Sequence, residues 1–239
     1  MIPLERLPAY LMDLDRNTLK YIAIIAMLAD HIAASFVPAD TLLYFIMRFI
    51  GRLTAPIMCF FIAEGFHYTR SKWKYSARLA VFALVSQFAY TLFFDGELTS
   101  TFFTQWNMIY TLLVGFCMLL AYDKISSMAL RWLVISALFI ASTVGDWMVF
   151  APAFILCFHV FRDNNRIKYA TFVIIAAAMA ALGFTFGEMW HIGIFLAIPL
   201  LLLYNGRKGS GYAVHKWAFY LFYPLHLLVI AIIRWPLLG

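Results

Sequence analysis

A group of ionisable residues lies inside two apolar segments near the N-terminus. The first segment reads KYIAIIAMLADHIAASF, and the second reads YFIMRFIGRLTAPIMCFFIAEGFH. Ionisable groups at membrane depth cost free energy and are therefore functional candidates by default. Histidines and carboxylates can transfer protons, and arginines can stabilise developing negative charge. The candidates are Lys20, Asp30, His31, Arg48, Arg52, Glu64 and His67.

The composition is that of a membrane protein. Of the 239 residues, 64% are hydrophobic and 13% are charged, whereas a soluble domain averages about 45–50% apolar and about 25% charged residues. A helix needs about 20 residues to cross the hydrocarbon layer. We therefore predict one all-α polytopic domain over 1–239, with about nine spans. These are 19–36, 42–67, 77–94, 105–122, 130–145, 147–161, 169–187, 189–204 and 217–233.

The basic residues predict an orientation in the membrane. All but three of the 18 lysines and arginines lie in the N-terminal segment or in every second loop; the exceptions are Arg48, Arg52 and Arg234. The positive-inside rule then places the N-terminus in the cytoplasm and the C-terminus outside. Because these bases are spread over separate loops, the net charge of +6 does not indicate a nucleic-acid partner.

The remaining signals of processing and metal binding are weak. Cys59, Cys117 and Cys157 fall in apolar runs, with no metal or disulfide spacing, so no metal site is predicted. The first apolar run carries Asp30 and His31 and lacks a cleavage-site pattern. It is therefore interpreted as a retained helix and not as a signal peptide.

Helical geometry relates the charged residues to one another. Lys20 and His31 are eleven residues apart, which puts them within about 20° of one face and about 16 Å apart. Arg48 and Arg52 share a face one turn apart and can form a structural ion pair with Asp30 or contact a substrate. Asp30 points about 100° away from its neighbour His31, so it pairs with an arginine or meets a substrate amine. Any carboxylate that orients His31 must come from another helix.

Glu64, His67 and two further polar residues occupy predicted spans or their ends. Glu64 and His67 form an i, i+3 pair near the inner end of the second span, and Pro56, between this pair and the arginines, is expected to kink or open the helix. Asn107 lies near the outer end of its span, and His226 lies near mid-depth in YLFYPLHLL. A structural and a functional role are both open for His226.

Three stretches resemble the TraX family of membrane proteins. They are LKYIAIIAMLADHIAASF, MRFIGRLTAPIMCFFIAEGFHYTRS and FYPLHLLVI. The resemblance covers nearly the whole chain and is strongest over 18–72. TraX proteins are associated with conjugation, and the founding member N-acetylates a pilin subunit. They are similar to a broader superfamily of multi-pass membrane acyltransferases, whose larger members have ten or more spans.

The resemblance implies an acetyltransferase of the bacterial inner membrane. It would move acetyl from cytoplasmic acetyl-CoA to an amine or hydroxyl acceptor on the extracytoplasmic side, such as a pilin N-terminus, another peptide, a small amine or a glycan. The superfamily pattern of a basic residue, ten intervening residues and a histidine is matched by Lys20 and His31. The superfamily's arginine-bearing second segment resembles the segment with Arg48 and Arg52.

Roles for the candidate residues follow from this implied reaction. His31 is expected to act as general base or as a transient acetyl carrier, with Arg48 or Arg52 stabilising the oxyanion. We predict a catalytic group, a group that binds the acetyl-CoA donor, and a group that binds the acceptor. The catalytic group is His31, Asp30 and Arg52; the donor group is Lys20, Arg48, Glu64 and His67; the acceptor group is Asn107 and His226.

Two other classes of protein compete with the enzyme. Asp30, His31, Glu64 and His226 can equally form the relay of a small proton-coupled transporter, although the sequence has no inverted repeat of the transporter kind. In a passive assembly or anchoring protein, the buried charges would only hold helices together. Binding and hydrolysis of acetyl-CoA distinguish the enzyme from both alternatives.

Overall fold

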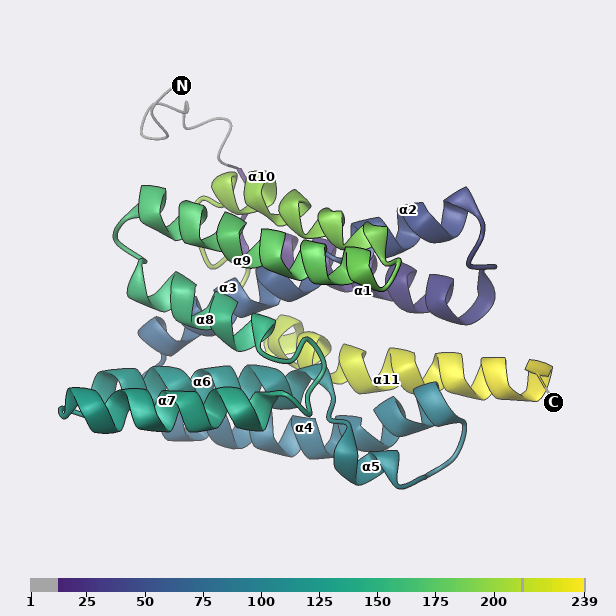
Figure 1. The fold of residues 1–239 in the computed structure, drawn as a ribbon, viewed down its shortest axis with the longest axis horizontal. Helices are drawn as coiled ribbons and strands as arrows, with labels where there is room; N and C mark the ends of the chain where they lie inside the picture. The colour runs from purple at the N-terminus through teal and green to yellow at the C-terminus, as the bar shows by residue number, and fades with distance from the viewer. Residues whose placement is uncertain (1–12, 212, 239) are drawn as a thin grey trace.

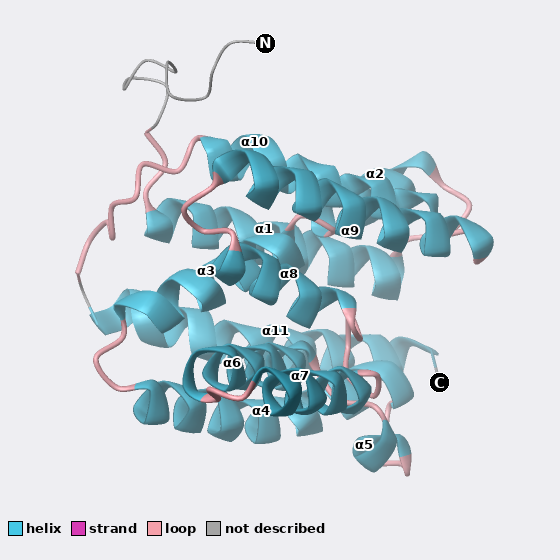
Figure 2. Cartoon of the chain, turned by 60° about the vertical axis from the view of Figure 1, so that its left-hand side comes forward, coloured by secondary structure: helices cyan, strands magenta, loops and turns pink. Residues whose placement is uncertain are grey.

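The protein is helical throughout the residues that its structure describes, 13–211 and 213–238. This computed structural model (Figures 1 and 2) has no strand in those residues, only isolated bridges between Leu14 and Tyr204 and between Trp106 and Gly145. The predicted all-α fold class is confirmed. The elements are α1 (Arg16–Phe36), α2 (Leu42–Gly51), α3 (Thr54–Tyr68), α4 (Lys72–Asp95), α5 (Thr101–Thr104), α6 (Met108–Lys124), α7 (Met128–Ser142), α8 (Phe150–Val160), α9 (Asn165–Thr185), the 3₁₀ helix η2 (Met189–Leu196), α10 (Ala197–Leu202) and α11 (Ala213–Leu238).

Each predicted span coincides with a helix or a pair of consecutive helices, but the count of nine spans is not confirmed. Within the described residues, five segments are long and apolar enough to cross a membrane. The 11-residue α8 extends only about 16 Å along its axis, roughly half of a hydrocarbon core of about 30 Å. The five segments are Arg16–Phe36, Leu42–Tyr68, Lys72–Asp95, Asn165–Thr185 and Trp217–Leu237.

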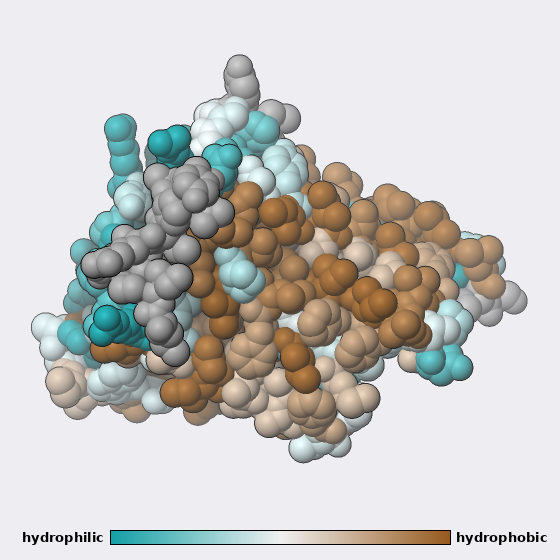
Figure 3. All heavy atoms as spheres, turned by 90° about the horizontal axis from the view of Figure 1, so that it is seen from above, coloured by the Kyte–Doolittle hydropathy of each residue, from teal (hydrophilic) through white to brown (hydrophobic). Residues whose placement is uncertain are grey.

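The surface divides into an apolar body and one largely hydrophilic end. Large apolar side chains are exposed along the body, among them Leu42, Leu133 and Ile140. Figure 3 shows most of the hydrophilic atoms gathered at one end and a smaller group at the other. The chain segments rich in lysine and arginine lie at the more hydrophilic end, on the left of Figure 1. An apolar surface of this extent is suited to lipid, so the protein has a membrane location. Which side of the membrane the basic end faces stays a prediction, and Arg6 lies outside the described residues.

The second long segment is broken where it passes the candidate site. α2 ends at Gly51 and α3 begins at Thr54, so the break comes just before Pro56 and not at it. Proline is tolerated in the first turn of a helix because its missing N–H has no intrahelical partner there. A Cβ on Gly51 would overlap the Asp30 side chain, and the Thr54 hydroxyl donates to the carbonyl of Ala23 at 2.9 Å. This close contact holds α2 and α3 against α1.

Candidate functional site

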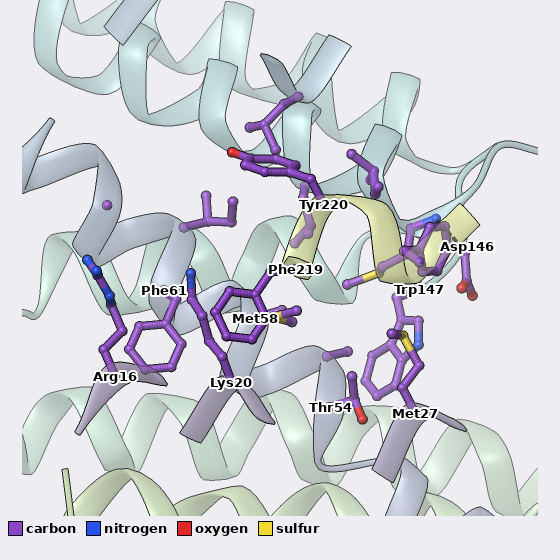
Figure 4. Close-up of a pocket in the computed structure, with 18 of the residues that line it drawn as sticks. Arg16, Lys20, Met27, Thr54, Met58, Phe61, Asp146, Trp147, Phe219 and Tyr220 are labelled. Atoms are coloured by element: carbon purple, nitrogen blue, oxygen red, sulfur yellow. Dashed lines mark hydrogen bonds between the residues drawn. The ribbon is translucent and has the colours of Figure 1, made fainter. Parts of the chain in front are cut away.

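A cavity of about 640 Å³ runs between the helices from the basic end into the bundle. Its size is within the range of about 300–1,000 Å³ that is usual for small-molecule sites. α1, α2, α3, α4, α6, α11 and the turn between α7 and α8 all contribute to its wall. Arg16 and Lys20 lie at one end of the close-up in Figure 4, and Asp146 and Trp147 lie at the other.

Asp30 sits between two arginines at the deep end of this cavity. Arg48 Nη1 donates to Asp30 Oδ2 at 2.9 Å, and Arg52 Nη2 donates to the same oxygen at 2.5 Å. The side chains are only 9–16% exposed, so pairing offsets much of the cost of burying them. The prediction that Asp30 pairs with an arginine is confirmed, for both arginines. Two cations on one carboxylate leave the cluster with a net positive charge.

Aromatic rings fix the two guanidinium groups. The Arg52 guanidinium carbon lies 5.5 Å from the centre of the Trp147 ring, and that of Arg48 lies 5.4 Å from Trp190 and 5.8 Å from Tyr44. Such cation–π contacts favour one orientation of the guanidinium plane. Because Arg48 and Arg52 also line the cavity, the ion pair and contact with a substrate are compatible with each other.

His31 contacts a second histidine instead of a carboxylate. Its Nδ1 lies 2.8 Å from His226 Nε2, which joins α1 to α11, and the edge of its ring packs on Phe93. His31 lines the cavity, whereas His226 is not among the lining residues. Among the described residues, no group hydrogen-bonds to His31 Nε2. The nitrogen of His31 that faces away from His226 is therefore free to act on a ligand.

The basic end of the cavity holds cations that form no ion pair with a described carboxylate. Arg16, Lys20, Arg78 and Lys208 line it, and none forms an ion pair with a described carboxylate. Lys20 Nζ instead lies between two rings, those of Phe61 at 5.3 Å and Phe219 at 5.2 Å. Sequence reasoning singled out Lys20 but missed the other three, because they also satisfy the positive-inside pattern of ordinary loops.

Glu64 and His67, predicted to bind the donor, both line a smaller pocket beside the main cavity, but only Glu64 also lines the main cavity. Glu64 lines the main cavity and accepts a hydrogen bond from the Tyr204 hydroxyl at 2.9 Å. His67 is exposed and lines a smaller neighbouring pocket of about 220 Å³. The donor-binding role of His67 stays a prediction, but the residue does not line the wall on which His31 lies.

Asn107 is buried away from the cavity lining. Its side-chain oxygen caps α6 by accepting from the backbone N–H groups of Ile109 and Tyr110. Its side-chain nitrogen donates to the Ala83 carbonyl at 2.7 Å and to Gln87 Oε1 at 2.8 Å. The geometry is that of a helix cap with a fully used amide, and the predicted contact with the acceptor stays untested.

The turn between α7 and α8 brings Asp146 to the cavity, which sequence reasoning did not single out as a site residue. Trp147 and Met148 have φ angles of 60° and 33°, an uncommon backbone conformation that often marks functional sites. The Thr111 hydroxyl donates to the Asp146 carbonyl at 2.7 Å. Burial raises the pKa of the Asp146 carboxyl, and nearby Arg52 opposes that rise. In the sequence, the only signal for Asp146 was its position in a two-residue gap between two apolar runs.

Comparison with known proteins identifies the family. The family model described as TraX protein matches residues 15–234. The chain belongs to the TraX family. A protein of Dichelobacter nodosus described as "Probable fimbrial assembly protein FimC, serogroup H1" is 34% identical over 232 residues, which cover 90% of this chain and 93% of that protein.

A second relative of this TraX protein matches a shorter stretch. It is described as "Uncharacterized protein RP591" of Rickettsia prowazekii and is 32% identical over 102 residues, 43% of this chain and 35% of that protein. No solved structure matches the chain significantly. The family resemblance drawn from the three sequence stretches is thus confirmed, and the arrangement of the cavity is the basis for assigning chemistry.

Proposed function

We propose that this TraX protein is an acetyltransferase of the bacterial inner membrane that uses acetyl-CoA as donor. One observation carries the proposal: His31 Nε2, which no described residue hydrogen-bonds, shares a cavity with the arginine cluster and with basic side chains that form no ion pair with a described carboxylate. A base, a site for an anionic donor and a group for developing negative charge are the parts that acyl transfer needs. A proton-coupled carrier has no need of the basic end.

The basic end suits the phosphates of coenzyme A. Arg16, Lys20, Arg78 and Lys208 supply four cations, and phosphate groups are favourable partners for such side chains. Because α1 rises about 1.5 Å per residue, Arg16 and His31 are about 22 Å apart along one helix. Acetyl-CoA would supply the acetyl thioester, and these residues would hold its anionic part at a distance from His31.

The deep end would carry out the proton transfers. His31 Nε2 would take the proton from the acceptor nitrogen or oxygen as it bonds to the acyl carbon, and would return that proton to the departing sulfur. Arg48 and Arg52 would stabilise the negative charge that develops on the acyl oxygen. This scheme uses His31 as a general base; a transient acetyl group on Nε2 is the alternative route through the same atom.

The acceptor is proposed from the relatives and not from the cavity. The Dichelobacter relative is described as a fimbrial assembly protein, and the resemblance to TraX implies acetylation of pilin. We therefore propose a pilin, or a similar peptide with a free amine, as the acceptor. Asp30 is occupied by two arginines, so the expectation that it receives the acceptor's ammonium has no support in this geometry.

Purified protein in detergent tests the proposal. Wild-type protein is expected to bind acetyl-CoA and to hydrolyse it slowly or transfer its acetyl group to an amine peptide. His31→Ala is expected to lower the rate of transfer by about 100-fold or more, with near-normal expression and folding. His191→Ala is the matched control, because His191 is also buried but does not line the cavity. Full activity in His31→Ala would contradict the assignment, and a wild-type protein without acetyl-CoA binding would favour a carrier or an anchor.

A further inference from the structure

His226 lies behind His31 when viewed from the cavity. It is 6% exposed and is absent from the residues that line the cavity. Its Nε2 contacts His31 Nδ1 at 2.8 Å, and its Nδ1 contacts the backbone carbonyl oxygen of Phe222 at 2.7 Å. Both ring nitrogens are therefore engaged by the protein, which is unlike the arrangement of a residue that binds a substrate.

The Phe222 carbonyl fixes the direction of both hydrogen bonds in the series from His31 through His226 to Phe222. A carbonyl oxygen only accepts, so His226 Nδ1 must carry the hydrogen that it donates to Phe222. In a neutral imidazole the other nitrogen is then an acceptor, so His226 Nε2 accepts from His31 Nδ1. His31 Nε2 is left with the lone pair, and this is the atom that no described residue hydrogen-bonds.

The surroundings of His226 favour its neutral form. Its ring stacks on Phe222 with centroids 4.8 Å apart and meets the edge of Tyr223 at 5.8 Å. Among the described residues, no carboxylate lies within ion-pair distance of either of its nitrogens. A second proton on His226 would be a buried charge without a counter-ion, which is costly. The stable arrangement is therefore the one in which both imidazoles are neutral, His31 donates to His226, and His226 donates to the Phe222 carbonyl.

We propose that His226 is a positioning residue that fixes the tautomer and the ring orientation of His31. The proposal rests on the proposed acetyl transfer. With Nδ1–H held by His226, His31 presents a lone pair at Nε2, takes a proton there from the acceptor and later gives the same proton to the departing sulfur. Nδ1 keeps its hydrogen throughout, and the bond to His226 stabilises the imidazolium between these two transfers. His226 plays the part that an acidic residue plays beside the histidine of a serine-protease triad.

Two substitutions separate hydrogen bonding from packing. In His226→Gln the side-chain oxygen can still accept from His31 Nδ1, whereas in His226→Phe the ring can stack on Phe222 but accepts nothing. We expect His226→Phe to lower kcat about 10- to 100-fold, as the loss of a partner that orients a metal-bound histidine does, with an unchanged KM for acetyl-CoA. His226→Gln should keep kcat within a few-fold of wild type. His191→Gln is the control, because His191 is likewise buried and contacts a backbone carbonyl oxygen.

A spectroscopic measurement tests the hydrogen-bond assignment without any acetyl donor. Nitrogen NMR of ¹⁵N-histidine-labelled protein distinguishes the two neutral tautomers, and His31→Gln identifies the His31 signals by their loss. We expect the Nδ1–H tautomer of His31 in wild type and in His226→Gln, and a mixture in His226→Phe. Thermal denaturation checks that all three proteins are folded.

Three results would overturn the inference. They are an Nε2–H tautomer of His31 in the wild type, a His226→Phe protein with wild-type kcat, and equal losses of kcat in His226→Phe and His226→Gln with an unchanged tautomer. If the wild-type protein transfers no acetyl group, the proposed function fails, while the NMR result still decides the contact between the two histidines. The two failures are thereby distinguishable.

Discussion

The two ends of the main cavity differ in how their charges are partnered. At the deep end, Asp30 is bonded to Arg48 and Arg52, and aromatic rings hold both guanidinium groups. At the basic end, Lys20 lies between two phenylalanine rings and forms no ion pair with a described carboxylate. The deep charges are positioned by the protein itself, whereas the cations of the basic end retain capacity for a ligand. The charges at the deep end should therefore govern stability and turnover, and the cations of the basic end should govern the affinity for acetyl-CoA.

The largest expected effect on stability comes from removing the shared carboxylate. Asp30→Ala leaves two buried arginines without a counter-ion, which should lower the free energy of unfolding by about 3–5 kcal/mol. Denaturant unfolding in detergent micelles measures this loss. Asp40→Ala is the control, since Asp40 is exposed in the loop between α1 and α2. Equal stability of the two variants would show that the cluster is not a structural ion pair.

A smaller loss is expected from crowding the same cluster without removing a charge. In Gly51→Ala the new methyl group overlaps Asp30, so either the carboxylate or α2 must shift, at a cost of about 1–3 kcal/mol. Gly211→Ala is the matched change, because a Cβ there meets nothing within 4 Å. The same unfolding measurement applies, and similar values for the two alanine variants would contradict the close packing of α2 on α1.

At the basic end, the loss of a charge should leave stability unchanged and weaken the binding of acetyl-CoA. Lys20→Met removes a partly buried cation that forms no ion pair with a described carboxylate, so we expect an unchanged or higher melting temperature. We expect an approximately tenfold higher Kd for acetyl-CoA, equivalent to about 1.4 kcal/mol. Titration calorimetry in detergent measures the Kd, and Lys20→Arg should restore most of the affinity. A destabilised Lys20→Met protein with normal affinity would reverse the comparison.

The smallest effect is expected at the exposed rim. Lys208 is solvent-exposed and lines the cavity, and exposed charge pairs contribute little. Lys208→Ala should raise the Kd for acetyl-CoA only about twofold, with a weaker dependence of affinity on salt. Lys124→Ala is the control, because Lys124 is exposed and is not among the residues that line the cavity. Indistinguishable salt dependence in the two variants would remove Lys208 from the donor site.

The sequence predicted contacts that depend on one helix or on two adjacent segments. Lys20 and His31 line one cavity because an eleven-residue separation returns to the same helical face. The pairing of Asp30 with the arginines followed from two consecutive apolar segments that had to bury opposite charges. The position of the helix break was less predictable, since Pro56 is accommodated in the first turn of α3.

Contacts between segments that are distant in the sequence could not be predicted from it. His31 and His226 are 195 residues apart in sequence, and only the packing of α11 beside α1 brings their rings together. Asn107 was a polar residue at the end of a span, and nothing in its sequence neighbourhood shows that Gln87 and Ala83 occupy its side-chain nitrogen. One periodic pattern establishes a face of a helix, but it does not establish which helix covers that face.

The shared carboxylate also determines the form in which an amine can react. The ion-paired cluster of two guanidinium groups and one carboxylate has a net positive charge, so we expect it to disfavour an ammonium ion and to admit the uncharged amine. Under the proposed function, an amine acceptor would therefore lose its proton to solvent before it reaches the cluster. The apparent KM for such an acceptor should fall as pH rises towards the amine's own pKa, about 7.7–8.0 for a peptide N-terminus, and level off above it.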